Sequence, residues 1–318
     1  MSSISIIIPT YNASLLIERT LCSILQQRGK HDLEIIIVDD CSTDDTVDVV
    51  KKQGIQSIKI LNQPQNLGPA AARNRGLTAA TGEFMAFLDG DDFWEADFLN
   101  ETTMFLQNHP QAVAVSVMQR HKTFNGKESI VPAKPPIPQP VLLDDFYDFW
   151  AKYNHVCTGS ALIRTAIAKA TGGQREDFRV CEDLEFWALI ATFGSWGFIP
   201  KVLFTSDGGA ITNAIGWHEK ARKRWASAVP IDEWSKRIVQ RLPQKLEKSF
   251  LRAQARIARG LAYSMMMDGR YEPARQDVLK YSAHFPKNCL NSAFAICSRS
   301  RCLWYLFSTL LRVREFLR

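Results

Sequence analysis

The sequence predicts an α/β fold with a doubly wound, mostly parallel sheet. Two features of residues 1–92 lead to this prediction: short runs rich in Ile and Val alternate with longer segments of helical character, and the runs are apolar almost throughout. Strands buried on both faces have this composition, because helices cover both sides of a parallel sheet. A half-exposed strand would alternate apolar with polar residues instead.

Four strands and three helices account for this region. The strands are expected at residues 4–8, 34–38, 57–61 and 84–88, and the helices at residues 14–27, 43–53 and 69–81. Pro69 suits the first turn of a helix, where its missing N–H is not needed. Ser42, with Asp45 three residues later, resembles a capping box for the second helix.

The pattern changes after Asp92. The proline-dense stretch at residues 132–140 is expected to be a loop. Helices that end at glycines are expected at residues 159–173 and 181–194, a helical hairpin at 261–281, and a helical, basic segment from about Trp234 onward. We therefore predict one domain at 1–217, with halves at 1–105 and 106–217, and a basic helical region at 218–318.

Charge is distributed unevenly along the 318 residues, whose net charge is +6. Residues 1–217 hold 18 Lys and Arg against 25 Asp and Glu, whereas residues 218–318 hold 21 against 8. The C-terminal region, at +13, suits an anionic surface, although arginines that only solubilise helices would give the same count. Its apolar stretch at 303–311 is too short to span a bilayer, and either lies in a membrane interface or packs on the protein.

Cysteine usage and the N-terminal residues indicate the cytoplasm. The seven cysteines include no CxxC pair, which favours reduced thiols over a zinc ribbon or a disulfide framework. A strand-like run begins at Ile4, so no signal peptide is expected. Nucleic acid is not an expected partner, because the basic region shows no pattern of stacking aromatic residues.

Polar residues follow three of the predicted strands at the point where each strand ends. Pro9-Thr10-Tyr11 follows the first, Asp39-Asp40 the second and Asp89-Gly90-Asp91 the fourth. Ligands of an open parallel sheet bind outside the carboxyl ends of its strands, so these segments should converge on one crevice. Asp40 is expected to cap the helix that follows it, which leaves Asp39 as the ligand contact.

Asp89 and Asp91 flank a glycine, which permits a sharp turn and leaves room for a ligand. Carboxylates are hard ligands suited to Mg²⁺ or Mn²⁺, and magnesium commonly takes one or two of them together with substrate phosphates. The segment is therefore interpreted as a bridge from protein to metal to diphosphate. A solvated acidic turn is the alternative.

Five segments carry a resemblance to a known family. They are SIIIPTYNAS, IIIVDDCSTDDT, NLGPAAARNRGL, GEFMAFLDGDD and CEDLEFW, in this order along residues 3–217. Together they resemble glycosyltransferase family 2, the inverting nucleotide-sugar transferases with a GT-A-type fold. The resemblance implies a Rossmann-like nucleotide-binding half, an acceptor half and, in this chain, a C-terminal helical extension.

The resemblance implies contacts to the donor nucleotide. Pro9, Thr10 and Tyr11 would line the base and ribose, and Asp39 would hydrogen-bond the base, which in this family is usually uracil. Arg73, in the segment AARN, would lie near the base and the diphosphate. A surface arginine on a helix is the alternative for Arg73.

The same resemblance implies the reacting groups. Asp89 and Gly90 would contact the ribose or the metal, and Asp91 would bind Mg²⁺ or Mn²⁺ directly. Asp183, beside Glu182, matches the catalytic base, which would take the proton of the acceptor hydroxyl. Acidic residues also begin helices for electrostatic reasons alone, so a capping role is the alternative for this pair.

Three further segments are candidates. His218 is a possible additional metal ligand, and residues 206–212 are rich in glycine and could close over bound donor. Residues 157–160 fall where the acceptor side of the family lies, although their small side chains could serve packing alone. The tryptophans at 94, 187 and 196 are expected in the core, whereas those at 150 and 217 could stack on sugars.

One departure from the family concerns the helix after Asp183. Many members carry an arginine a few residues after the acidic pair, and here Leu184-Glu185-Phe186-Trp187 stands instead. The local ion pairing, and the choice between Glu182 and Asp183 as base, are therefore open at this point.

Three functions compete. The first is an inverting, metal-dependent transferase of a hexosyl or N-acetylhexosaminyl group from a UDP-sugar to a glycan or lipid-linked acceptor, in the cytoplasm and peripherally at the inner face of the cytoplasmic membrane. A non-catalytic nucleotide-binding or membrane-associated module is the second. A sugar nucleotidyltransferase is the third, and it ranks lowest because no glycine-rich, basic phosphate loop follows the first strand.

Overall fold

The computed structural model describes residues 2–122, 126–207, 217–285 and 288–316, with only the backbone at 217–220 and 316. The chain forms two compact units. The first comprises Met1–Glu176 and Phe186–Asn213, and the second comprises Asp177–Glu185 and Ala214–Arg318. Helix α7 (Glu182–Ile190) therefore begins in the second unit and ends in the first.

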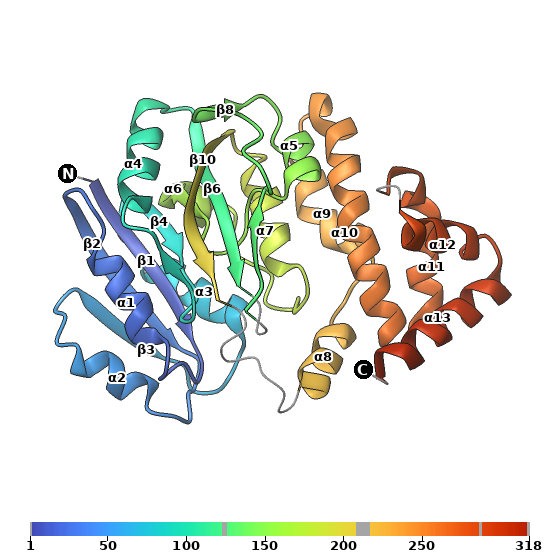
Figure 1. Cartoon of the computed structure of the whole chain (residues 1–318), viewed down its shortest axis with the longest axis horizontal. Coiled ribbons are helices and arrows are strands. Elements are labelled where there is room, and N and C mark those ends of the chain that lie inside the picture. The colour runs from blue at the N-terminus through green and yellow to red at the C-terminus, as the bar shows by residue number, and fades with distance from the viewer. Residues whose placement is uncertain (1, 123–125, 208–216, 286–287, 317–318) are drawn as a thin grey trace. The chain divides into compact units, whose positions relative to one another are not determined.

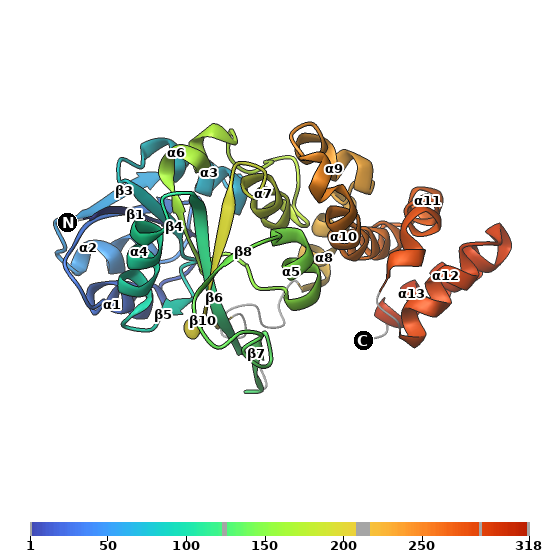
Figure 2. The same cartoon turned by 90° about the horizontal axis from the view of Figure 1, so that it is seen from above.

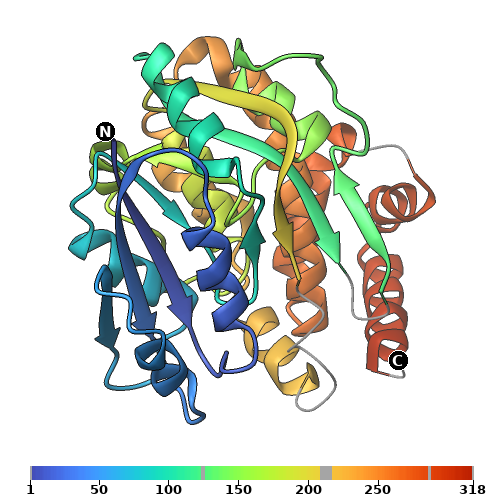
Figure 3. The same ribbon diagram turned by 60° about the vertical axis from the view of Figure 1, so that its left-hand side comes forward.

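A mixed sheet is the centre of the first unit, with strands in the order β3–β2–β1–β4–β9–β6–β10–β5 (Figure 1). Four parallel strands form its first half: β1 (Ser2–Thr10), β2 (His31–Asp39), β3 (Ile58–Asn62) and β4 (Phe84–Phe87). Their arrowheads point to the same edge of the sheet (Figure 3). The α/β class and the four strands predicted from the sequence are thus confirmed.

The second half of the sheet mixes directions. Strand β9 (Ala161–Arg164) is antiparallel to both β4 and β6 (Ala112–Lys122), and β10 (Ser195–Ser206) is parallel to β6. Strands β5 (Phe93–Trp94) and β8 (Val141–Leu143) are antiparallel to β10, and β7 (Glu128–Val131) to β6. Strand β10 consequently runs in the direction of β4 and ends at the same edge.

Helices cover both faces of the parallel strands, as the apolar runs predict. On one face, Ile4, Ile6 and Ile8 share a core with side chains of α1 (Ile17–Leu25), α2 (Thr46–Lys52) and α4 (Phe98–Asn108). On the other face lie α3 (Pro69–Ala79) and α6 (Thr165–Ala170), on the opposite side from α1 (Figure 2). Helix α5 (Phe146–Tyr153) follows the proline-dense loop, which is confirmed as irregular.

Small side chains allow α3 to approach the sheet closely. A Cβ atom at Gly76 would lie 2.2 Å from Cγ2 of Ile7, so only glycine fits there. The helix begins at Pro69, as predicted, after Gly68 with a φ of 92°. This close contact holds α3 against β1 about one turn after Arg73.

Two local expectations were wrong. Residues 159–173 form strand β9 and then the short helix α6, not one helix, because a short apolar run has no periodicity that separates the two. Ser42 and Asp45 do not form a capping box: Oγ of Ser42 accepts from the backbone N–H of Asn12 at 2.9 Å. The first turn of α2 is held instead by Asp44, whose Oδ1 accepts from the N–H of Thr46.

The second unit is helical. Its helices, apart from the start of α7, are α8 (Trp217–Ala226), α9 (Ile231–Val239), α10 (Glu247–Met267), α11 (Tyr271–Tyr281), α12 (Cys289–Cys297) and α13 (Arg301–Phe316), with 3₁₀ turns at Gln244–Leu246 and Ser282–His284. The long helix α10 contacts α8, α9, α11 and α13 and supplies buried Ile257, Leu261 and Met265. The predicted hairpin at 261–281 is confirmed as the end of α10, a turn at Gly269 and α11.

Candidate active site

Thr10 joins the three polar strand ends. Strand β1 lies between β2 and β4, Thr10 pairs in register with Asp39, and the carbonyl of Thr10 accepts from the N–H of Asp40 at 2.8 Å. On its other side, Cγ2 of Thr10 lies 3.1 Å from the position of a Cβ at Gly90. The structure therefore brings together the segments around residues 10, 39 and 90, as the topology of a parallel sheet requires.

Asp39 is oriented but retains an unused acceptor. The residue is 4% exposed, and its Oδ2 accepts from the N–H of Ser42 at 3.1 Å. Its Oδ1 is buried, and no donor among the described residues reaches it. Buried polar atoms are nearly always hydrogen-bonded, so Oδ1 is suited to a donor that arrives with a ligand.

Asp40 has a different role from its neighbour. Its Oδ1 accepts from Nε2 of Gln63 at 2.7 Å and from the N–H of Leu67 at 2.8 Å, and its Oδ2 accepts from the N–H of Gly68 at 2.8 Å. The expectation that Asp40 caps the next helix was wrong, since these bonds hold the loop before α3. Its carboxylate is occupied by the protein, which leaves Asp39 for a ligand.

The residues predicted beside Asp39 differ in exposure. Pro9 and Thr10 are buried within the end of β1, whereas Tyr11 is 47% exposed. Of these three side chains, Tyr11 is therefore the one that a nucleotide can cover. Thr10 acts through its backbone and methyl group, which fix the distance between β2 and the Asp89–Asp91 turn.

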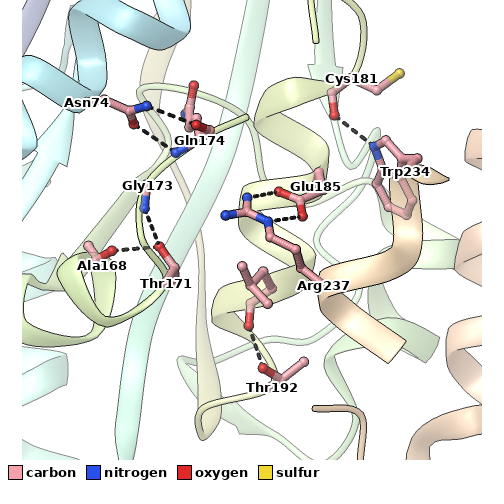
Figure 4. Close-up of polar contacts among 11 residues, drawn as sticks. Asn74, Ala168, Thr171, Gly173, Gln174, Cys181, Glu185, Thr192, Trp234 and Arg237 are labelled. Atoms are coloured by element: carbon pink, nitrogen blue, oxygen red, sulfur yellow. Dashed lines mark hydrogen bonds and ion pairs between the residues drawn. The ribbon is translucent and has the colours of Figure 1, made fainter. Parts of the chain in front are cut away.

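Arg73 forms an ion pair with Asp89. Nη2 of Arg73 donates to Oδ1 of Asp89 at 2.8 Å and to Oδ2 at 3.1 Å, and Nη1 donates to Oε1 of Gln174 at 3.3 Å. Gln174 is itself fixed by Asn74, whose Oδ1 accepts from its N–H and whose Nδ2 donates to its carbonyl (Figure 4). Arg73 is 5% exposed, so the alternative that it is a surface arginine was wrong.

Negative charge is crowded in the turn after β4. Burial, together with the charge of Asp89, raises the pKa of Asp91 to about 6. The pKa of Asp92 is raised well above its usual range by burial and by the charges of Asp89 and Asp91. Asp92 accepts from the N–H of Asp207 at 2.9 Å, so it has a partner within the protein. A cation bound beside Asp91 would relieve this repulsion.

Two residues of this site were missed from the sequence. Arg19 of α1 donates from Nη2 to the carbonyl of Asp91 at 2.6 Å and pairs through Nη1 with Oδ2 of Asp207 at 2.5 Å. Its guanidinium also lies 4.8 Å from the centre of the Phe93 ring. Asp207 directly follows β10, and an acidic residue after a fourth strand is a signal that the sequence contains. The direction of β10, which brings Asp207 to this edge of the sheet, cannot be predicted from the sequence.

The donor set fits a divalent cation. Asp89 and Asp91 supply hard oxygen atoms in a place where negative charge is concentrated, which favours Mg²⁺ or Mn²⁺ over softer metals. Within the described ranges, no group of three or more His, Cys, Asp or Glu side chains is arranged around one point as a metal cage would be. Magnesium commonly takes one or two protein carboxylates together with phosphate oxygens, and Asp89 and Asp91 are carboxylates of this kind.

Glu182 and Asp183 begin α7 in the second unit and are both half-buried. The preceding Cys181 has a φ of 61°, and its thiol has a pKa raised to about 12 by burial and by the charges of Asp183 and Glu182. Its carbonyl accepts from Nε1 of Trp234 at 2.9 Å (Figure 4). Helix α9 thus holds the segment that carries the acidic pair.

The arginine missing from α7 is replaced by one from α9. Arg237 donates from Nε to Oε1 of Glu185 at 2.8 Å and from Nη2 to Oε2 at 2.5 Å (Figure 4). Glu185 is 0% exposed, so this two-point ion pair is the partner that its charge requires. The doubt about local ion pairing is resolved, since the C-terminal region supplies the cation.

The tryptophans and residues 157–160, the other candidates whose side chains the structure describes, serve packing. Trp94, Trp150, Trp187 and Trp196 are buried, so Trp150 belongs to the core and is not a sugar platform. Gly159 is packed against Phe204, which favours a packing role for residues 157–160. The side chains of Trp217 and His218 and most of the predicted lid at 206–212 lie outside the described residues.

The architecture belongs to the GT-A-type class of α/β proteins. The fold matches S. aureus TarS 1-349 in complex with UDP with a TM-score of 0.58 at 18% identity, over 93% of this chain and 91% of that one. It matches the mannosyltransferase PcManGT from Pyrobaculum calidifontis, in complex with GDP-Man and Mn²⁺, with a TM-score of 0.57 at 18% identity, over 98% and 87%. Similarity at this identity shows the fold.

The family model for glycosyl transferase family 2 matches residues 5–171, a little over half of the chain. The chain belongs to this family, and the resemblance found in the sequence is confirmed.

Two curated relatives illustrate the family. A putative teichuronic acid biosynthesis glycosyltransferase, TuaG, of Bacillus subtilis is 43% identical over 105 residues, 32% of this chain and 41% of that protein. WfaP of Escherichia coli, a UDP-Glc:alpha-D-GlcNAc-diphosphoundecaprenol beta-1,3-glucosyltransferase, is 40% identical over 124 residues, 39% of this chain and 49% of that protein. The chain thus spans less than half of the length of these relatives.

Across the described ranges, every helix is either too short or too polar to cross a lipid bilayer.

Proposed function

We propose that this protein is an inverting, metal-dependent glycosyltransferase that moves a hexosyl or N-acetylhexosaminyl group from a UDP-sugar to a hydroxyl of a glycan or lipid-linked acceptor in surface polysaccharide synthesis. The observation that carries the proposal is the meeting of Asp39 and the Asp89–Asp91 turn on either side of Thr10. A nucleoside diphosphate needs a hydrogen-bonding group at its base and a site that balances the negative charge of its phosphates. Asp39 can supply the first, and a cation bound at the Asp89–Asp91 turn can supply the second.

Asp39 supports a uracil donor. Its buried Oδ1 accepts no hydrogen bond within the described chain, and the imide N–H of uracil is a donor of the kind that it lacks. Tyr11, exposed at the end of β1, offers a ring face beside it. The UDP bound by TarS 1-349 and the UDP-Glc in the name of WfaP agree with this choice.

Asp91 would bind the metal directly, with Asp89 beside it and His218 as a candidate third ligand. Bound Mg²⁺ or Mn²⁺ would neutralise charge on the departing diphosphate. The protein's own part is to hold the turn: Arg73 fixes Asp89, Arg19 fixes the carbonyl of Asp91, and Thr20 donates to the carbonyl of Gly90 at 3.0 Å. A site fixed in advance needs little rearrangement when charge develops.

Asp183 would act as the general base, with Glu182 as its neighbour. It would take the proton of the acceptor hydroxyl as the oxygen forms its bond to the anomeric carbon, while the bond to the diphosphate breaks. A single displacement with no enzyme nucleophile inverts that carbon. Arg237 and Trp234 of α9 support this role by holding the segment on which the base lies.

The C-terminal charge and the name of one relative support the proposed acceptor and place of action. The +13 of residues 218–318 suits an anionic membrane, and the diphosphoundecaprenol in the name of WfaP is a lipid carrier. The proposal therefore includes peripheral contact with the inner face of the cytoplasmic membrane.

A thermal-shift screen of nucleotides with and without Mn²⁺ tests the donor and the metal. UDP with Mn²⁺ should stabilise the protein, by about 2.7 kcal/mol at a concentration near 100 times its Kd, and UDP alone should do so much less. Asp91→Asn should remove the Mn²⁺ effect, and Asp183→Asn should keep it while losing sugar transfer. Stabilisation by UDP that is independent of metal in the wild type would refute the metal assignment, and wild-type transfer by Asp183→Asn would refute the base.

A further inference from the structure

Helix α13 exposes a stripe of large apolar side chains. Leu303, Leu306, Leu310 and Val313 are between 50% and 61% exposed, and their spacing of three, four and three residues places them on one face of the helix. The opposite face is packed: Trp304 is 0% exposed, and its Nε1 donates to the carbonyl of Tyr271 at 2.6 Å. The stripe is therefore an outer face of a helix already docked on its unit.

The neighbouring helix α12 also carries exposed apolar side chains. Ile296 is 61% exposed and Leu290 is 41% exposed, and α12 and α13 contact each other through the rings of Phe294 and Phe307, whose centres are 5.4 Å apart. Isolated exposed apolar residues are ordinary, but four large ones on a single face of α13 mark a surface that another apolar phase covers.

A groove of about 400 Å³ opens between α10, α12 and α13. Its lining combines two guanidiniums with apolar walls and includes Arg259, Tyr263, Leu290, Phe294, Leu311 and Arg314. Neither Arg259 nor Arg314 has a hydrogen bond or ion pair within the described part of the chain. Glu315 also lines the groove, and its Oε2 accepts from the hydroxyl of Tyr263 at 2.9 Å. The groove thus offers two cations beside the apolar stripe.

The charges identify what covers this face. Residues 288–318 hold five arginines and one acidic residue, Glu315. The arginines flank the stripe at both ends, with Arg299 and Arg301 before it and Arg312 and Arg314 after it. Two copies that paired along α13, in either direction, would place arginines opposite arginines, which opposes self-association. A surface of negative headgroups over an apolar interior matches both features.

We propose that the α13 stripe and the adjoining groove form a docking surface for a bilayer that contains anionic phospholipids. The stripe enters the boundary between headgroups and acyl chains, and Arg259 and Arg314 contact lipid phosphates. Helix α13 has 16 residues, fewer than the roughly 20 that span a bilayer, so it lies along the interface. This inference rests on the membrane contact in the proposed function and gives it a location.

Co-sedimentation of the full chain with vesicles tests the proposal, with no donor or metal present. The vesicles are phosphatidylcholine alone, or an equal mixture with phosphatidylglycerol. We expect binding to the mixture, weakened by salt. The double variant Arg259→Gln, Arg314→Gln should bind the mixture about 25-fold more weakly, about fivefold for each arginine, and its binding should depend less steeply on salt. The double variant Leu306→Ser, Leu310→Ser should bind more weakly by about tenfold or more.

Matched controls lie on the first unit. Leu15 is 89% exposed and Lys51 is exposed, so Leu15→Ser and Lys51→Gln remove the same kinds of side chain elsewhere and should leave vesicle binding unchanged. Circular dichroism melting of each variant separates loss of binding from loss of folding, because the changed side chains are exposed or line an open groove.

Four outcomes would overturn the proposal. They are no binding to the mixed vesicles at low salt, equal binding by the leucine variant, binding of soluble glycerol phosphate as tight as vesicle binding, or a concentration-dependent dimer that the leucine variant abolishes. Because no donor is used, failure here leaves the Mn²⁺-dependent binding of UDP untouched, and failure of that binding leaves this test valid.

Discussion

Arg73, on the first turns of α3, donates from one nitrogen to both carboxylate oxygens of Asp89 at the end of β4. The guanidinium is almost completely buried and the carboxylate is about one-third exposed, with side-chain exposures of 6% and 32%. Arg73 therefore lies inside the protein, and Asp89 is partly open to solvent. The pair sets the position of the Asp89–Asp91 turn from within and leaves the outer side of the carboxylate for a ligand.

Replacement of Arg73 by Met should destabilise the protein and remove donor binding together. Arg73→Met keeps the apolar stem but leaves Asp89 without its cation, beside Asp91 and Asp92, so the free energy of unfolding should fall by about 2–3 kcal/mol. Urea unfolding measures this fall, and calorimetry with UDP and Mn²⁺ measures binding. Arg75, whose Nη1 donates to the carbonyl of Asn62 from the exposed side of the same helix, provides the control Arg75→Met. Equal effects of the two changes would contradict a special role for Arg73.

Substitution of Asp39 should impair UDP binding, whereas substitution of its neighbour Asp40 should lower the stability of the fold. Asp39→Asn weakens the acceptor that would face the base, and hydrogen bonds to charged groups contribute about 1.5–3 kcal/mol, so UDP affinity should fall about 10- to 100-fold with little change in melting temperature. Asp40→Asn disturbs three hydrogen bonds to the loop before α3 and should lower the melting temperature, while the folded fraction binds UDP normally. If Asp39→Asn lowered the melting temperature and Asp40→Asn weakened UDP binding, the roles assigned to the two residues would be wrong.

The stability of the helical unit should fall as pH rises toward neutrality because of Asp277. Burial raises the pKa of Asp277 to about 7, above the usual value of 3.8, although its Oδ2 accepts from the N–H of Ile231 at 2.9 Å. A carboxyl whose folded pKa is raised contributes its full stability below about pH 4 and loses it between about pH 4 and 7. Asp277→Asn keeps an acceptor oxygen and removes the charge, so the variant should be more stable than the wild type at pH 8, by up to about 4 kcal/mol, and similar at pH 4. Chemical unfolding at both values measures this, and parallel pH profiles for the two proteins would count against it.

The parallel half of the fold could be predicted because its signals are local. Each strand is an apolar run buried on both faces, and Pro69 begins its helix at the predicted residue. The segment 159–173 could not be assigned in the same way: strand β9 has only four residues, and a run of that length carries no period.

The residues of the candidate site were likewise predictable only where the signal is local in the sequence. Residues of the parallel half, such as Asp39 and Asp89, could be predicted because parallel strands end at one edge. Arg19 and Asp207 could not, because their meeting depends on the direction of β10, which follows from the antiparallel strand β9. Arg237 lies about 50 residues from its partner in the sequence, and no local pattern connects distant charges of that kind.

The Glu185–Arg237 pair should be the most sensitive contact of the segment that carries the proposed base. Glu185 is fully buried and Arg237 is partly exposed, so Arg237→Met strands a buried carboxylate and should cost about 3–5 kcal/mol, whereas Glu185→Gln strands a less buried cation and should cost less. The double variant should recover much of the loss, since it removes both charges, and urea unfolding of all four proteins gives the coupling energy directly. If the pair also positions Asp183, the double variant should transfer sugar more slowly than the wild type while UDP with Mn²⁺ stabilises both equally. Additive losses across the cycle would show that the two side chains act independently, and an unchanged transfer rate in the double variant would restrict the pair to a role in stability.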